Sequence, residues 1–101
     1  MRPLTTDMGD LDRRPYFLWD EDVSVGELRR ILRERSEEDP TRLRLLGKAL
    51  REGRDIDIWT FVTPIDVARA LPHLGRRLGR RRAFWEFLIG GWQADGLLPA
   101  A

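Results

Sequence analysis

Residues 39–53 read DPTRLRLLGKALREG, and they decide the fold class because they combine a helical pattern with signals for both helix ends. Asp39 is a favoured capping residue type, and Pro40 suits the first helical position. Gly53 is placed to end the helix in a left-handed cap. The apolar positions between these ends recur at the spacing of one helical face: Leu43, Leu46 and Leu50.

The segment before this helix predicts another helix. Ser24 and Glu27 have the spacing of a capping box, in which a hydroxyl and a carboxylate satisfy free amides at a helix start. Apolar residues then keep helical spacing to about Ser36. An apolar burst at residues 15–19 precedes the capping box and is too short for a helix, so we expect an extended segment whose aromatic side chains dock on the core.

The segment after Gly53 is ambiguous at residues 55–62. Its alternation and β-branched content suggest a strand, but a lone strand in a helical chain has no evident partner. We therefore favour a short helix, with Asp55 as its cap. Thr63 then opens a further helix that we expect to end at Leu71, because Pro72 disfavours helical geometry in the residue before it.

A last helix is expected from Gly79 or Arg80 to Ala94, closed by Gly96. The sequence thus predicts an all-α fold, a single compact domain of four to five short helices over residues 15–96. Residues 1–14 lack periodicity and are expected to be a flexible tail, and residues 97–101 a frayed end.

The charge distribution is uneven although the net charge is only +1. Residues 1–40 carry seven arginines and eleven acidic residues, whereas residues 41–101 carry eleven basic and six acidic residues. Such a chain suits self-association, an acidic partner or a basic face on its second half. Seventeen arginines to one lysine indicate a GC-rich, bacterial coding bias.

The location that composition favours is the cytoplasm. The chain has no cysteine, which excludes disulfides and thiolate metal sites. No apolar run approaches membrane-spanning length, and the N-terminus lacks the pattern of a signal peptide.

Catalytic patterns are weak, so we expect no enzymatic activity and no cofactor. The sole histidine, His73, has no visible nucleophile or orienting partner. The acidic pairs at 20–22 and 55–57 lack the rest of a calcium loop, and no glycine-rich phosphate loop appears, so no metal site is predicted.

Residues 74–82 read LGRRLGRRR and form the one candidate contact surface, because they carry five arginines and no acid. Two interpretations stay open. The arginines meet carboxylates of a protein partner or phosphates of a nucleic acid, or they pair internally with Asp20-Glu21-Asp22 if Trp19 docks beside Trp85. The candidate contact residues are Arg76, Arg77, Arg80, Arg81 and Arg82.

Residues 63–94 have roughly the outline of a helix-turn-helix. Their second helix, however, carries Phe84, Trp85, Phe87 and Leu88 where base-reading side chains would be polar. Arg81 falls on the side of Trp85, so it is expected to be structural while the arginines at 76, 77 and 80 face outward. Trp92, next to two glycines, is the tryptophan expected to be exposed and to anchor a partner.

Several segments together resemble a group of small uncharacterised prokaryotic proteins encoded beside nucleotidyltransferase-type toxins of abortive-infection systems. The likeness covers about residues 15–92, and its motifs are structural rather than catalytic. The segments are 17–24, Ile31-Leu32, 55–59, 63–67, 71–74 and 82–85. The resemblance implies an antitoxin-like or accessory role with a cognate toxin as partner. The arginines at 76–82 are more numerous than in that group.

The leading hypothesis from sequence is therefore a cytosolic, non-enzymatic adaptor that binds a protein through the arginine-rich segment and nearby aromatic residues. The alternative is a small DNA-binding regulator whose arginines contact phosphates, with an affinity that falls steeply with salt.

Overall fold

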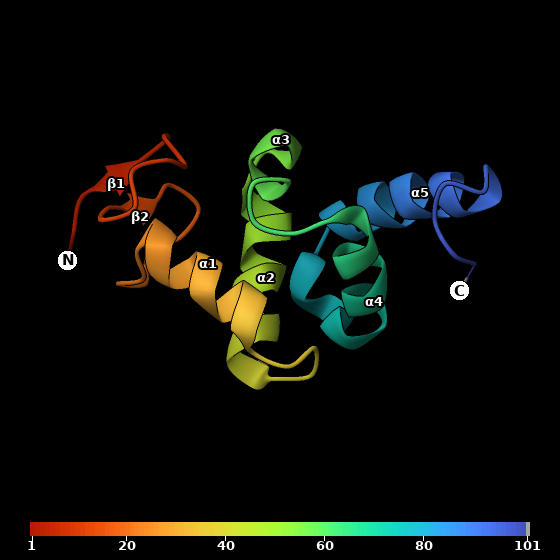
Figure 1. The fold of residues 1–101 in the computed structure, drawn as a ribbon, viewed down its shortest axis with the longest axis horizontal. Coiled ribbons are helices and arrows are strands. Elements are labelled where there is room, and N and C mark those ends of the chain that lie inside the picture. The colour runs from red at the N-terminus through yellow and green to blue at the C-terminus, as the bar shows by residue number, and fades with distance from the viewer. Residues whose placement is uncertain (101) are drawn as a thin grey trace.

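A computed structural model describes residues 1–100 of the chain. It is mostly helical, and a pair of very short strands precedes the helices (Figure 1). The molecule is elongated, with extents of 42 × 24 × 23 Å. The elements in chain order are β1 (Leu4–Thr5), β2 (Arg14–Pro15), α1 (Val25–Glu34), α2 (Pro40–Glu52), α3 (Asp55–Ile58), α4 (Pro64–Leu74), the 3-10 turn η1 (Gly75–Leu78) and α5 (Arg81–Ala94).

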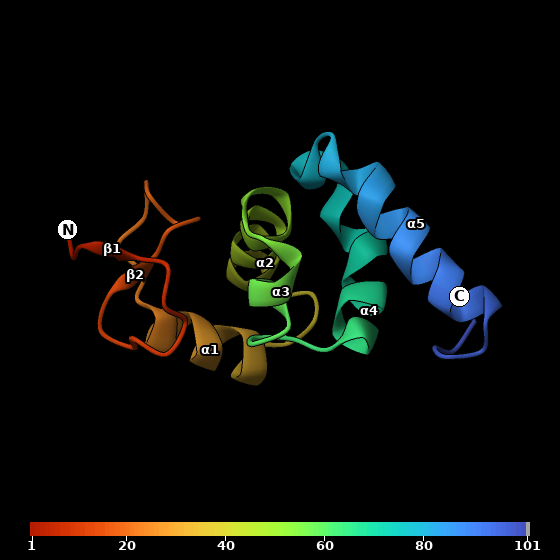
Figure 2. The ribbon, with the colours of Figure 1, turned by 90° about the horizontal axis from the view of Figure 1, so that it is seen from above.

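Helix α2 is the centre of the domain. It contacts α1, α3, α4, η1 and α5, and both views place it between the N-terminal elements and the pair α4–α5 (Figures 1 and 2). Its buried face is wide enough to serve neighbours on both sides, which explains why the leucine-rich stretch decides the fold. The buried apolar residues of α2 are Leu43, Leu45, Leu46, Ala49 and Leu50.

The helix starts follow the capping signals closely. The Asp39 carboxylate accepts the backbone N–H of Arg42 at 2.9 Å, as predicted. Thr63 and Asp66 form a complete capping box at the start of α4. At α1 only half of the predicted box forms. The Ser24 hydroxyl accepts the N–H of Glu27, whereas the Glu27 carboxylate binds Arg2 at 2.6 Å.

The end of α2 differs from the prediction of a left-handed cap. Gly53 has a φ of −84°, which any residue can adopt. Glycine is needed there for space, because a Cβ would lie 2.7 Å from the Ala49 carbonyl oxygen and 3.2 Å from atoms of Phe17 and Ile58. The lack of space beside the last turn of α2 and two packed side chains therefore favours glycine at this helix end.

Two further boundaries correct the sequence analysis. Residues 55–62 do begin as a helix, but α3 is a single turn and its first residue is not the cap, since Arg54 precedes it without a side-chain cap. Helix α4 does not end at Leu71 but continues through Pro72 to Leu74. Pro72 has no N–H to donate to the carbonyl four residues earlier, and α4 continues for two residues beyond it without that hydrogen bond.

The first fourteen residues pack onto the domain instead of forming the expected flexible tail. Leu4 and Thr5 pair in parallel with Arg14 and Pro15, so the fold is not purely all-α. Met8 is only 6% exposed. Two strands of two residues are too short to produce a periodic sequence pattern, which is why the sequence does not predict them.

Arginine side chains tie the N-terminal half together by donating to backbone carbonyls. The buried Arg14 guanidinium donates to the carbonyls of Arg2, Leu18 and Trp19, at 2.5, 3.2 and 2.8 Å. Arg42, also buried, donates to the last turn of α1 at the Leu32 carbonyl. Arg29 reaches from α1 to two separate loops, at the carbonyls of Met8 and Thr60.

The C-terminal segment folds back instead of fraying directly after α5. Gly96 has a φ of +76°, and its N–H donates to the Gln93 carbonyl while Leu97 donates to the Trp92 carbonyl. This is the Schellman pattern of helix termination. Leu98 then packs against the core. The last position of the predicted frayed end, residue 101, lies outside the described residues.

Candidate partner-binding surface

The bend between α4 and α5 is built around two glycines. Gly75 and Gly79 have φ values of +55° and +52°, which disfavour any L side chain. Between them Leu78 is fully buried and fixes η1 on the core. As a result Arg76 and Arg77 project from η1 between the glycines. The six residues from Gly75 to Arg80 also make this connection longer than the three or four residues of a helix-turn-helix turn.

The arginine-rich segment divides into an outer and an inner group. Arg76, Arg77 and Arg80 are exposed. Within residues 1–100, no carboxylate lies within 4.0 Å of their guanidinium groups. We call these three residues the outer arginines. They have the exposure expected from sequence.

Arg81 and Arg82 are half-buried and serve the fold. The Arg81 guanidinium carbon lies 4.6 Å from the centroid of the Phe84 ring and 5.8 Å from that of Trp85. Arg82 pairs with Glu86 at 2.5 Å and donates to the Gly75 carbonyl at 2.9 Å. These contacts join the start of α5 to the end of α4, so both side chains have intramolecular roles.

The acidic segment 20–22 does not pair with the arginines at 80–82, contrary to one of the interpretations drawn from sequence. Asp20 pairs with Lys48 of α2, and Glu21 pairs with Arg44 one turn earlier. The hydrogen bond from Lys48 is the main cause of a lowered pKa of the Asp20 carboxyl. That interpretation required Trp19 to dock beside Trp85, and no such contact occurs among the aromatic pairs of the described residues.

A shallow basic hollow of about 270 Å³ lies where α2 and η1 meet the acidic segment. Four basic and two acidic side chains line it, so an excess of positive charge faces solvent there. Arg77 of η1 lies at its rim and packs closely on α2 at Gly47. A side chain at Gly47 would bring its Cβ within 3.2 Å of the Cβ and Cδ of Arg77. The lining residues are Asp20, Glu21, Arg44, Lys48, Arg51 and Arg77.

Trp19, not Trp92, is the exposed tryptophan. Trp19 is 47% exposed, and its ring centroid lies 4.6 Å from the Lys48 ammonium nitrogen at the basic hollow. Trp92 is half-buried, with its ring centroid 5.9 Å from that of Trp59. Sequence reasoning missed Trp19 because residues 17–19 look uniformly apolar. Only the directly following acidic residues hint that the chain turns to solvent there.

Helix α5 exposes two aromatic rings. Phe87 is 81% exposed and Phe84 is 38% exposed, although Trp85 between them is fully buried. The Trp85 indole N–H donates to the Leu50 carbonyl at 2.9 Å, which anchors α5 on α2. The outward phenyl rings are therefore held on a fixed helix.

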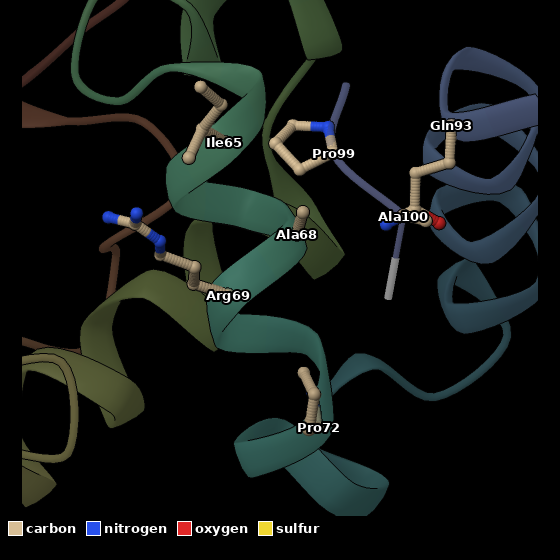
Figure 3. Close-up of a pocket in the computed structure, with 7 residues that line it drawn as sticks. All are labelled: Ile65, Ala68, Arg69, Pro72, Gln93, Pro99 and Ala100. Carbon is tan, nitrogen blue, oxygen red and sulfur yellow. The ribbon is translucent and has the colours of Figure 1, made fainter. Parts of the chain in front are cut away.

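An apolar cleft of about 340 Å³ lies between α4 and the C-terminal segment (Figure 3). Arg69 at its rim extends away from Gln93 and pairs with Glu37 at 3.4 Å (Figure 3). The cleft thus presents carbon atoms rather than a set of converging acids and bases. Its apolar lining comes from Ile65, Ala68, Pro72 and Pro99.

His73 is half-exposed, and its Nε2 lies 3.9 Å from a Glu38 carboxylate oxygen at the surface. In residues 1–100 no three His, Cys, Asp or Glu side chains gather as a metal site would require. Over the same residues, no helix has the length and apolar character to cross a membrane. Comparisons of the chain with protein-family models, curated proteins and solved structures gave no match.

Proposed function

We propose that this chain is a non-enzymatic protein-binding adaptor that contacts an acidic surface of its partner. The observation that carries the proposal is the group of outer arginines, which are exposed and have no ion pair within residues 1–100, whereas ten ion pairs of arginine or lysine with carboxylates occupy charges elsewhere in that range. Carboxylates of a partner would supply the missing counter-charges, and planar guanidinium groups suit bidentate pairing with them.

The basic hollow extends this contact surface toward Trp19. An aromatic ring beside arginines is a frequent anchor in protein interfaces. A partner segment that offers carboxylates flanking one apolar side chain would pair with Arg76 and Arg77 and cover Trp19. The resemblance stated above adds a specific candidate, a cognate toxin, so we propose an antitoxin-like or accessory role in a toxin–antitoxin or phage-defence system, in the cytoplasm.

The exposed side of α5 supports a DNA-binding role less well than it supports protein binding. The solvent-facing positions of this helix from residue 83 onward carry alanine, glycine and phenylalanine, and the charged side chain among them is Glu86. An acidic side chain would repel phosphates, and the others have no group that reads a base edge. DNA binding is therefore an outcome that the experiment must be able to detect.

The test is co-purification of the tagged chain with the product of each gene adjacent to its own, at two salt concentrations. We expect a complex that Arg76→Gln/Arg77→Gln abolishes. The matched control is Arg30→Gln/Arg33→Gln, since these α1 side chains are also exposed and have no ion pair within residues 1–100. Absence of any complex, or equal loss in both variants, contradicts the proposal.

The same variants separate protein binding from DNA binding. Titration of the purified chain with DNA from its own promoter should show no saturable binding that distinguishes the two variants. Promoter binding that weakens steeply with salt and is lost in Arg76→Gln/Arg77→Gln would instead favour the regulator.

A further inference from the structure

The outer face of α5 is an apolar surface that no other part of residues 1–100 covers. Figure 2 shows the helix at the edge of the molecule, with α4 on its inner side. Its outward positions recur with helical spacing and are all exposed, in contrast to the inner side, where Trp85 and Ile89 are buried. The exposed positions of this face are Arg80, Ala83, Phe84, Phe87, Gly90, Gly91 and Ala94. Glu86 is also exposed, at the edge of the face, where it lines a groove against α4 together with Gly90.

The size of the side chains changes along this face. The first half carries Phe84 and Phe87, and the second half carries Gly90, Gly91 and Ala94. The face therefore has a raised half and a hollow half, about two helical turns each. Two such faces fit one another when the helices run antiparallel, because each raised half then meets the other's hollow half.

Within residues 1–100, neither Gly90 nor Gly91 is at a position whose backbone or packing requires glycine. Neither has a positive φ, and a Cβ at either position would meet nothing within 4 Å. Glycine in a helix interior weakens the helix compared with alanine. Gly90 and Gly91 therefore leave the second half of this face open to the close approach of another surface.

Charge at the two ends of α5 is complementary in the same antiparallel arrangement. Arg80 and Arg81 stand at its start and Asp95 directly after its end, and none of the three has an ion pair within residues 1–100. They are about 21 Å apart along the helix, too far to pair with each other. A second α5 running the opposite way brings its Asp95 near the arginines, and the helix dipoles are also opposed.

We propose that two copies of this chain associate through the outer faces of α5, packed antiparallel about a two-fold axis near the middle of the helix. Phe87 of each copy lies over Gly90 and Gly91 of the other, and Phe84 lies toward the other's Ala94. An isologous contact of this kind is self-complementary and closes at two copies. It leaves Arg76, Arg77 and the basic hollow free, so it does not depend on the proposed binding of a heterologous partner.

The interface is small, so the association is reversible. A phenylalanine side chain has roughly 200 Å² of surface, and an 81% exposed Phe87 therefore contributes on the order of 150 Å² per copy. One helix face per copy places the whole contact at the low end of specific interfaces. The dimer should accordingly appear with rising concentration.

Sedimentation equilibrium of the purified chain, from about 10 μM to 1 mM, is the direct test. The mass should rise from 11.8 kDa toward twice that value. Phe87→Lys should hold the mass at 11.8 kDa throughout. Ile56→Lys is the matched control, since Ile56 is 66% exposed on α3, away from this face, and this variant should behave as the wild type.

Gly91→Leu separates the dimer from the stability of one copy. A Cβ at this exposed position meets nothing within 4 Å in a single copy, and leucine raises helix propensity, so thermal unfolding at low concentration should shift upward. In the dimer it fills the space that receives Phe87 of the other copy, so dissociation should become at least tenfold easier. A wild type that stays at 11.8 kDa up to 1 mM, or a Gly91→Leu variant that associates as well as the wild type, overturns the proposal.

The antiparallel direction has its own test, because the chain has no cysteine of its own. Ala83→Cys/Ala94→Cys should give a covalent dimer under oxidised glutathione, which takes up the two electrons and two protons of each new disulfide. Each single variant should remain uncrosslinked, since like positions are about 16 Å apart along the antiparallel pair. Efficient crosslinking of either single variant would show a parallel pair and refute the proposed geometry.

Discussion

Replacing Trp85 with phenylalanine should destabilise the domain more than any other single tryptophan-to-phenylalanine change. Trp85 is fully buried, and its indole N–H donates to the Leu50 carbonyl. That carbonyl lies in the last turn of α2, where intrahelical donors run out. The N–H of Arg54, four residues on, donates to the Tyr16 hydroxyl instead. Phenylalanine would therefore leave a buried carbonyl without a partner.

The size of the effect has two parts. A buried acceptor without a donor costs about 1–3 kcal/mol. The void left by the smaller ring adds about 1–2 kcal/mol, less than the roughly 3–5 kcal/mol of full truncation to alanine. The expected loss is thus about 2–5 kcal/mol. At about 4–8 °C per kcal/mol for a domain of this size, the midpoint of thermal unfolding falls by roughly 10 °C or more.

Urea unfolding followed by far-ultraviolet circular dichroism measures this loss without relying on tryptophan fluorescence. Trp19→Phe is the control, because Trp19 is 47% exposed and donates no hydrogen bond from its ring among the bonds of residues 1–100; it should change the free energy of unfolding by less than about 1 kcal/mol. A benzothienyl analogue at Trp85 keeps the ring shape and lacks the N–H. If that analogue is as stable as the native chain, or if both Phe variants are equally stable, the proposed role of the hydrogen bond is refuted.

Three further predictions concern helix ends and glycines. Gly53→Ala should lower the free energy of unfolding by about 1–3 kcal/mol in urea unfolding, because its Cβ would meet the Ala49 carbonyl oxygen at 2.7 Å; an unchanged value contradicts the space argument. Gly90→Ala should raise stability by about 0.5–1 kcal/mol at low concentration, since a Cβ there meets nothing; a loss measured by thermal unfolding would show a hidden contact. The pKa of the Asp39 carboxyl is lowered in the folded chain, chiefly by the hydrogen bond from the N–H of Arg42. The ionised carboxylate therefore contributes fully to the free energy of unfolding at pH values above the ordinary pKa of 3.8, and this contribution is lost as the pH falls from 3.8 toward the lower pKa of the folded state. Asp39→Asn keeps a capping side chain without the titration, so its urea stability should fall less between pH 5 and pH 3; an equal fall would exclude Asp39 as a source.

The helix starts could be predicted because their signals are local. Asp39 with Pro40, and Thr63 with Asp66, act within one turn of chain, and the structure confirms both starts. The geometry at Gly53 could not be predicted, since glycine is needed there for space against the Ala49 carbonyl and the side chains of Ile58 and Phe17, and Phe17 is distant in sequence. Local signals are sufficient where the interaction itself is local.

At the candidate surface, too, local interactions could be predicted and long-range ones could not. Helical periodicity correctly placed Arg81 on the side of Trp85, because these two residues lie about one turn apart within α5. The partners of the acidic segment could not be predicted that way. Asp20 pairs with Lys48, 28 residues on, and this choice depends on how the apolar residues before Asp20 dock on α2. The exposure of Trp19 follows from that docking too.

The arginine contacts to backbone carbonyls have a consequence for how this chain tolerates substitution. Arg14 and Arg42 hold distant segments by oxygens that every amino acid possesses. Leu18, Trp19 and Leu32 can therefore change identity without losing those hydrogen bonds, whereas the arginines cannot be replaced. Leu18 and Leu32 are also buried in the apolar core, so a saturation mutagenesis map should be one-sided at the contact of Arg14 with Trp19, which is 47% exposed. Pairs of positions joined in this way would show no compensating double mutants, although they touch in the folded chain.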